Sequence, residues 1–168
     1  MGSLYEKCDN GNQLRIVTPE LKSDVLNNYY WKHHNRFNNA VKNHLEHTKS
    51  CLILDCHSFP SSPLTRALVQ NRNTPDFNIG TDSYNTPSNL IEASQDFFKL
   101  RGLSLGIDTP YSGSIVPMEY YQKEPRVTSI MLEVNRRLYL NEPTNEKSEG
   151  YDKTKEIVRG YMSLLRSL

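Results

Sequence analysis

The sequence has few of the features that mark secreted, membrane-spanning and nucleic-acid-binding proteins. Three cysteines in 168 residues, Cys8, Cys51 and Cys56, fit neither a disulfide framework nor a CxxC zinc knuckle. No apolar run approaches the ~20 residues of a membrane-spanning helix, and residues 1–6 lack the apolar core of a signal peptide. A net charge of +1 supplies no basic surface for nucleic acid. We therefore expect a cytoplasmic protein that binds neither nucleic acid nor membrane.

Amphipathic helices alternate with apolar strands along the chain, which is long enough for a single domain over 1–168 and short for two. The 3.6-residue and two-residue periodicities predict helices at 19–47, 87–101 and 151–168, and strands at 51–58, 75–80, 103–108 and 126–135. Thr18 and Thr86, each followed by proline, are expected to cap the first two helices. Residues 143–150 are expected to form a loop. This order predicts a three-layer α/β/α domain with a mainly parallel or mixed sheet.

The strand that begins at Cys51 ends in chemically active side chains. Alternation places Asp55 and His57 on one face, at the carboxyl end where open α/β sheets bind ligands. A histidine next to an acid in this position can bind a metal ion, but a hydrogen-bonded structural histidine is the commoner case. Cys56 points to the opposite face, which disfavours a Cys–His catalytic pair, and we expect it in the core.

Glu133 is the second unusual residue, because it carries a carboxylate into the middle of the apolar strand 126–135. Burying an unpaired charge costs several kcal/mol, so the group must be partnered, protonated or facing a cavity. Burial would raise its pKa toward the range of a general base. The alternative is a buried ion pair with Arg136, Arg137 or Lys99.

Five segments carry a resemblance to a known family, and they occur in the family's order over most of the chain: Tyr29–His34, Leu52–Ser58, Pro75–Asp82, Pro110–Ser114 and Leu132–Tyr139. Together they resemble the N-formylglutamate amidohydrolases, whose fold is similar to that of the zinc carboxypeptidases and aspartoacylases. No single segment is specific, but five in order are. The resemblance implies a carboxypeptidase-like fold and a zinc-dependent hydrolase for the amide bond of a small N-acyl amino acid such as N-formylglutamate.

The resemblance also implies roles for individual residues. His57 resembles the histidine that binds the metal, and Glu133 resembles the carboxylate that activates water. The residues that it suggests for substrate binding are Arg136, Tyr111, Ser112 and Gly113, with His34, Thr81 and Asp82 as weaker candidates.

The chain departs from the family at its N-terminal end. Family members carry a preceding segment with a His-Ser-Gly type motif and a further acidic ligand, and this chain begins after it, as if truncated. One histidine does not complete a catalytic zinc site, which normally has three protein ligands. We therefore expect that the chain is a fragment, that a homo-oligomer or companion chain supplies the N-terminal part, or that the reaction is lost. In the last case the same scaffold would be an inactive binding module for an acidic small molecule or a peptide terminus.

Overall fold

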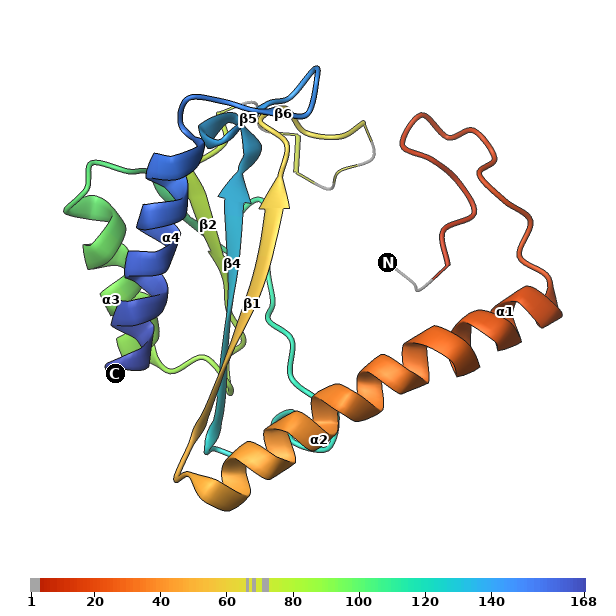
Figure 1. Ribbon diagram of the computed structural model, residues 1–168, viewed down its shortest axis with the longest axis horizontal. Helices are drawn as coiled ribbons and strands as arrows, with labels where there is room; N and C mark the ends of the chain where they lie inside the picture. Colours follow the sequence, from red (N-terminus) through yellow and green to blue (C-terminus); the bar gives the residue numbers. More distant parts are fainter. Residues whose placement is uncertain (1–3, 66, 68, 71–72) are drawn as a thin grey trace.

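The protein is built on a four-stranded sheet with the order β1-β4-β2-β3. The computed structural model describes residues 4–65, 67, 69–70 and 73–168. The strands are β1 (Cys51–Phe59), β2 (Phe77–Gly80), β3 (Leu105–Ile107) and β4 (Val127–Asn135) (Figure 1). β1 is parallel to β4 and β2 to β3, whereas β2 runs antiparallel to β4. The α/β class is confirmed, and the sheet is mixed.

The main core lies between one face of the sheet and two helices, α3 (Ser88–Lys99) and α4 (Tyr151–Arg166), which pack side by side (Figure 1). Alternate residues of the strands point toward the helices because successive side chains of a strand leave opposite faces. The buried residues of this core include Phe77, Ile79, Ile130 and Leu132 from the sheet and Phe98, Tyr161 and Leu165 from the helices. Each fully buried side chain of this size contributes ~1.5–3 kcal/mol, so this core is a large source of stability.

The opposite face of the sheet is covered only in part. The C-terminal half of helix α2 (Trp31–His47) and the segment 114–121 pack over the first residues of β1 and β4, where Val41, Cys51 and Val127 are buried together. The later residues of the two strands extend beyond this cluster. The predicted three-layer, carboxypeptidase-like arrangement stays a prediction.

A long helical arm precedes the sheet. Thr18 caps it as predicted, since its Oγ1 accepts a hydrogen bond of 3.2 Å from the N–H of Leu21. The arm continues through α1 (Pro19–Val25), the π-helical turn η1 (Leu26–Tyr30) and α2, and Figure 1 shows it extending away from the sheet. The predicted helix over 19–47 is confirmed, apart from the π-helical turn. None of the helices in the described chain is long and apolar enough to cross a membrane.

Two local features differ from the predictions. Thr86 does not cap α3, because its hydroxyl donates at 2.6 Å to the carbonyl of Ser129 in β4, and the helix begins at Ser88. The predicted loop 143–150 contains a short strand, β6 (Glu146–Lys147), which pairs with β5 (Leu140–Asn141) after the turn η2 (Arg136–Leu138). Hydrophobic periodicity shows neither difference. The partner of Thr86 lies far away in the sequence, and β6 consists of two charged residues.

Candidate functional site

His57 and Asp55 form a close pair near the end of β1. The two residues share a face of the strand, and His57 Nε2 lies 2.8 Å from Asp55 Oδ1. The His57 side chain is 49% exposed and that of Asp55 is 23% exposed. When Nε2–H donates to the carboxylate, Nδ1 of the neutral imidazole carries the lone pair. The pair therefore presents an oriented imidazole that can accept a proton or bind an ion.

Glu133 lies beside His57 on the same face. The two residues are partners in the parallel pairing of β1 with β4. Glu133 is 7% exposed, and its Oε2 has no hydrogen-bond partner among the described residues. Burial raises the pKa of Glu133, and the nearby charge of Asp55 adds to this effect, although His57 and Arg136 oppose it. A carboxyl with a raised pKa next to an imidazole is suited to proton transfer.

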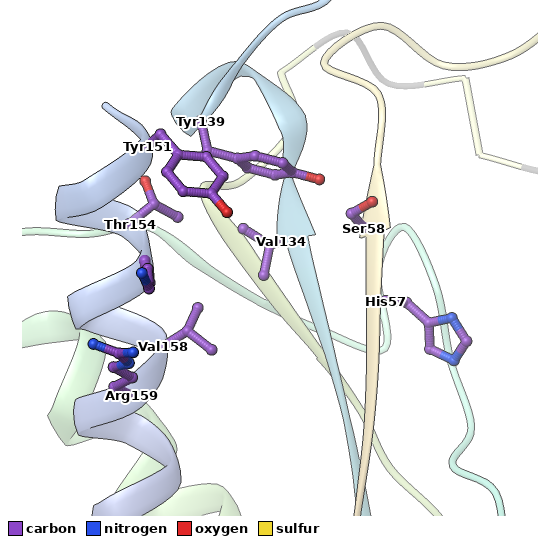
Figure 2. Close-up of a pocket in the computed structure, with 9 residues that line it drawn as sticks. His57, Ser58, Val134, Tyr139, Tyr151, Thr154, Val158 and Arg159 are labelled. Atoms are coloured by element: carbon purple, nitrogen blue, oxygen red, sulfur yellow. The ribbon is translucent and has the colours of Figure 1, made fainter. Parts of the chain in front are cut away.

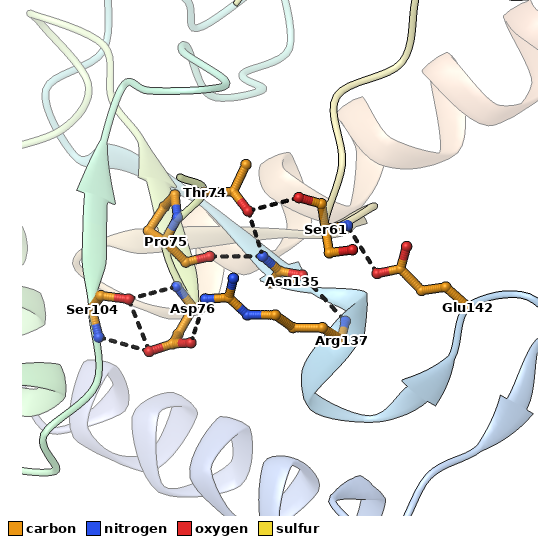
Figure 3. Close-up of polar contacts among 8 residues, drawn as sticks. All are labelled: Ser61, Thr74, Pro75, Asp76, Ser104, Asn135, Arg137 and Glu142. Atoms are coloured by element: carbon orange, nitrogen blue, oxygen red, sulfur yellow. Dashed lines mark hydrogen bonds and ion pairs between the residues drawn. The ribbon is translucent and has the colours of Figure 1, made fainter. Parts of the chain in front are cut away.

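Two of the basic residues that could have paired with Glu133 lie elsewhere. Arg137 Nη2 binds Asp76 Oδ1 at 2.8 Å, as Figure 3 shows. Lys99 ends helix α3, which covers the opposite face of the sheet. A purely structural ion pair with either residue therefore does not account for the buried carboxylate.

A polar network fixes the end of the sheet near Glu133 (Figure 3). Asn135 Nδ2, at the end of β4, donates to Thr74 Oγ1 at 3.1 Å and to the carbonyl of Pro75 at 2.9 Å. Asp76 in turn accepts hydrogen bonds from the N–H and the hydroxyl of Ser104, just before β3. These contacts tie β4 to the segments that precede β2 and β3, so the backbone that carries the candidate site is held in place.

The loop with Tyr111, Ser112 and Gly113 crosses the sheet beside Glu133. Asn78, which pairs with Glu133 in the antiparallel register of β2 and β4, is fully buried and donates from Nδ2 to the carbonyl of Tyr111 at 2.8 Å. Burial raises the pKa of Tyr111, and so does the negative charge of Glu133. Ser112 is exposed. The structure thus brings this predicted loop to Glu133.

Thr81 and Asp82 follow β2 and are engaged within the protein. The N–H and the hydroxyl of Thr81 donate to the carboxylate of Asp108 at 2.8 and 2.6 Å. Asp82 accepts hydrogen bonds from the N–H of Asn85 and the hydroxyl of Tyr121. Burial acts to raise the pKa of Asp82, but the hydrogen bonds outweigh it, and the pKa is lowered. Both residues stabilise the turn, and their contact with a substrate stays a prediction.

Arg136 and His34, the remaining predicted contacts, lie in different surroundings. Arg136 Nε donates to Ser58 Oγ at 3.3 Å, and its charge acts on the carboxyl of Glu133. His34 lies on the helical arm, where its ring stacks on Tyr30 with 5.9 Å between the centroids. It lines a hollow of about 430 Å³ to which His57 does not contribute. Arg136 therefore contacts the end of β1 at Ser58 and is close enough for its charge to lower the pKa of Glu133, whereas His34 lies in a separate hollow.

A second hollow, of about 260 Å³, lies at the edge of β1 on the side of α4. Its lining includes His57, Tyr139, Tyr151 and Val158, although Figure 2 shows the ring of His57 pointing away from the other three. This hollow is therefore behind β1 with respect to Glu133.

The described residues do not complete a zinc site. Over the part of the chain that the structure describes, no three His, Cys, Asp or Glu side chains are grouped to hold a metal ion. Nε2 of His57 is also bonded to Asp55. A catalytic zinc ion normally has three protein ligands, so this set of side chains does not fit the ion unaided. The prediction of an incomplete zinc site with His57 as one ligand stays a prediction.

Sequence reasoning missed Asn78 and misplaced Cys56. A fully buried amide in the four-residue strand β2 must be hydrogen-bonded, and an asparagine between Phe77 and Ile79 was the available signal. Cys56 was expected in the core, but it is exposed. The prediction was wrong because β1 lies at the edge of the sheet, which the order of elements along the chain does not reveal.

Known proteins resemble the chain over most of its length. A family model described as N-formylglutamate amidohydrolase matches residues 3–140. No curated protein matches the chain. The solved N-formylglutamate amidohydrolase from Ralstonia eutropha JMP134 is similar, with a TM-score of 0.75 and 22% identity over 93% of this chain and 60% of that chain. A gene product from Agrobacterium tumefaciens has a TM-score of 0.64 and 14% identity, over 97% and 62%. The chain thus spans less than two thirds of either protein, and these likenesses show the fold.

Proposed function

Because the chain belongs to the N-formylglutamate amidohydrolase family, we propose that it takes part in hydrolysing the amide bond of a small N-formyl amino acid such as N-formylglutamate. The observation that carries the proposal is the position of Glu133, a buried carboxylate whose Oε2 has no hydrogen-bond partner among the described residues and whose strand partner is His57. A structural carboxylate would be expected to have both oxygens bonded. An oxygen reserved for water or substrate accounts for the difference.

Glu133 acts as the general base in this proposal. Water adds to the formyl carbon while its proton passes to the carboxylate, and the C–N bond then breaks as the carboxyl returns that proton to the leaving nitrogen. The products are formate and the free amino acid. The raised pKa of Glu133, caused first by burial, increases its basicity near neutral pH. Asp55 holds the imidazole of His57 beside it.

Arg136 and the Tyr111 loop are proposed to bind the substrate. The planar guanidinium of arginine fits a carboxylate with two parallel hydrogen bonds, and the charge of Arg136 acts on the carboxyl of Glu133. Ser112 and Gly113, next to Tyr111, offer a hydroxyl and backbone groups to the rest of the substrate. Roles for Thr81, Asp82 and His34 are weaker parts of the same proposal.

The second part of the proposal is that the protein binds zinc and that His57 is one of the ligands. The other ligands would come from outside the described residues, in a second copy or a companion chain. Elemental analysis would give the zinc content per chain. We expect added zinc to raise the melting temperature of the wild-type protein and not that of His57→Ala. His44→Ala, at an exposed position on the helical arm, is the matched control and should respond as the wild type does. A wild-type melting temperature that does not respond to zinc would contradict this part.

The reaction is tested by incubating the purified protein with N-formylglutamate and measuring formate release, with and without zinc. Glu133→Gln should lower the rate by about 10²–10⁴-fold, the usual contribution of a general base. Glu156→Gln removes a carboxylate from an exposed position of α4 and should leave the rate unchanged. Equal rates for the wild type and Glu133→Gln would overturn the role of Glu133.

A binding module without catalysis is the second candidate function, favoured by the lack of a complete metal site among the described residues. It predicts that N-formylglutamate binds, by calorimetry, without formate release, and that Arg136→Ala weakens this binding. Turnover that is lost in Glu133→Gln would reject it. The carboxypeptidase-like three-layer fold and a cytoplasmic location complete our proposal, and the mixed α/β sheet supports the former.

A further inference from the structure

One residue from each strand contributes to a row that crosses the sheet at Glu133. Glu133 of β4 has His57 of β1 as its partner on one side and Asn78 of β2 on the other. Gly106 of β3 comes next, as the partner of Asn78. Residues that are opposite each other in neighbouring strands point to the same face. Asn78 therefore lies on the face of the candidate site, one strand away from Glu133 and on the side opposite His57.

The amide of Asn78 is bonded at both ends to the backbone that begins the Tyr111 loop. Its Oδ1 accepts a hydrogen bond from the N–H of Thr109 at 3.1 Å, and its Nδ2 donates to the carbonyl of Tyr111 at 2.8 Å. Asn78 is fully buried, and a Cβ at Gly106 would overlap the carbonyl oxygen of Thr109, so this part of the loop lies directly on the sheet. An amide offers an acceptor and a donor together. A carboxylate or an apolar side chain at this position would lose at least one of the two bonds.

Tyr111 reaches from Asn78 across β4. Its carbonyl is bonded on β2, whereas its ring meets that of Phe59, at the end of β1, with 5.7 Å between the centroids. Because β4 lies between these two strands, Tyr111 spans the strand that carries Glu133. The charge of Glu133 acts on the phenol of Tyr111, in agreement with this position. Tyr111 thus forms one side of the candidate site, and its place depends on the point where its backbone is bonded.

We propose that Asn78 is a positioning residue of the candidate site, which fixes Tyr111 beside Glu133 at the place where the substrate binds. The inference rests on the proposed function, since Asn78 acts through Tyr111, a proposed substrate contact. Asn78 does not itself transfer a proton, because both ends of its amide are bonded to the loop. Loss of this amide should therefore weaken substrate binding and leave the general base in place.

Steady-state kinetics with N-formylglutamate, in the presence of zinc, test this role. Asn78→Ala should raise KM by roughly ten- to a hundredfold, the range for one lost hydrogen bond to a charged group. The value of kcat should stay unchanged, as expected when the ground state and the transition state lose the same binding energy. An unchanged KM in a variant that circular dichroism shows to be folded would overturn the proposal.

Asn85 provides the matched control, because it is a second buried amide that is bonded at both ends. Its Nδ2 donates to the carbonyl of Val127 at 2.9 Å, and its Oδ1 accepts from the N–H of Gln122 at 3.1 Å. Asn85→Ala should therefore lower the melting temperature about as much as Asn78→Ala does and leave KM unchanged. An equal rise of KM in both variants would show a general loss of structure and would also overturn the proposal.

The phenol of Tyr111 reports the position of the loop without turnover. Burial and the charge of Glu133 raise its pKa, so the pKa should fall toward the ordinary tyrosine value in Asn78→Ala and not in Asn85→Ala. NMR titration of isotope-labelled tyrosine measures it, with Tyr111→Phe to assign the signal. An unchanged pKa in Asn78→Ala would overturn the positioning role even if the protein hydrolyses the substrate. A wild type that releases no formate would instead reject the proposed reaction, and the titration would still decide whether Asn78 positions Tyr111.

Asn78→Asp keeps the proposal testable if Asn78→Ala does not fold, since it preserves the size of the side chain. The ionised carboxylate accepts from the N–H of Thr109 but cannot donate to Tyr111, whereas the protonated carboxyl can do both. Burial and the neighbouring charge of Glu133 favour the protonated form. The Tyr111 signal of this variant should match the wild type at low pH and move away from it as the pH rises through the pKa of the new carboxyl. A signal that matches the wild type at every pH would refute the role of Asn78.

Discussion

Glu133 links stability to pH at the scale of a single residue. Burial raises its pKa in the folded protein, so the folded state keeps its proton at pH values where the unfolded chain has lost it. In that window, which begins near the ordinary glutamate pKa and extends upward, the folded state binds more protons than the unfolded state. The contribution of this group to stability is therefore fully present at low pH and is lost as the pH rises through the window.

The first prediction is that Glu133→Gln stabilises the protein near neutral pH. The amide removes a buried charge with an unbonded oxygen, so the free energy of unfolding should rise by about 1–3 kcal/mol. At about pH 4 the wild-type carboxyl is itself protonated, and the gain should shrink. Urea unfolding at both pH values measures the difference. With Glu156→Gln as the exposed control, a neutral-pH gain no greater than the control's would contradict the account.

The second prediction concerns the pH dependence of turnover. As a general base, Glu133 works only when deprotonated, so the rate should fall as the pH decreases through its pKa. Because burial raises that pKa, the acidic limb of the profile of kcat/KM should lie above the ordinary glutamate range. Formate release measured across pH checks this. If the acidic limb of the kcat/KM profile lay at the ordinary glutamate pKa, the general base would be a solvent-exposed carboxylate and not Glu133.

Some residue contacts could be predicted from sequence because they follow from alternation along one strand. Asp55 and His57 are two apart in β1, and their shared face is certain once the strand is known. To predict that Glu133 lies beside His57, one must also know that β1 pairs with β4. The sequence suggested this pairing, because both strands carry polar side chains near their ends, but it did not establish it. The pairing of Arg137 with Asp76 joins residues far apart in the chain, so no local pattern shows it.

At the scale of elements, β2 and the Tyr111 loop approach so closely that Gly80 leaves no room for a side chain. A Cβ at Gly80 would overlap the carbonyl oxygen of Gly113 and the side chain of Met131. Gly113 itself has φ +87°, a conformation that favours glycine. Glycine at both positions therefore lets the loop lie on the strand beside Glu133.

The third prediction is that Gly80→Ala destabilises the protein by about 1–3 kcal/mol, the usual range for overpacking, and displaces Tyr111. Gly160→Ala is the matched control, since its Cβ would make ordinary contacts with Phe97 and alanine favours a helix by about 1 kcal/mol over glycine. Thermal unfolding and tyrosine NMR signals measure the two effects. Equal melting temperatures for both variants would show that the loop moves freely.

The ends of a helix could be predicted from sequence only where the capping residue bonds to its own helix. Thr18-Pro19 and Thr86-Pro87 present the same local signal, yet only Thr18 caps its helix. The hydroxyl of Thr86 is instead bonded to the carbonyl of Ser129, because β4 lies within its reach. The helix still forms, one residue later than expected, because its apolar face packs in the core. Tertiary contacts thus moved a boundary without changing the element.

At the scale of the whole molecule, the helical arm and the sheet differ in how firmly they are held. Neither α1 nor η1 contains a buried residue, whereas Val41 of α2 is buried against the start of β1. Stability within a protein follows buried apolar contacts and is not uniform. The sequence predicted one amphipathic helix over this whole stretch, since periodicity does not show where a helix leaves the body that it packs against.

A pair of proline substitutions tests this difference. Proline inside a helix costs about 3 kcal/mol or more where the helix is held by packing. Lys42→Pro, next to the buried Val41, should therefore lower the melting temperature by roughly 6–12 °C for a chain of this size. Asn28→Pro, in η1, breaks a segment that packs on little else, so it should reduce helical circular dichroism with a much smaller thermal shift. If both lowered the melting temperature equally, the arm would have to be part of the same cooperative unit as the sheet.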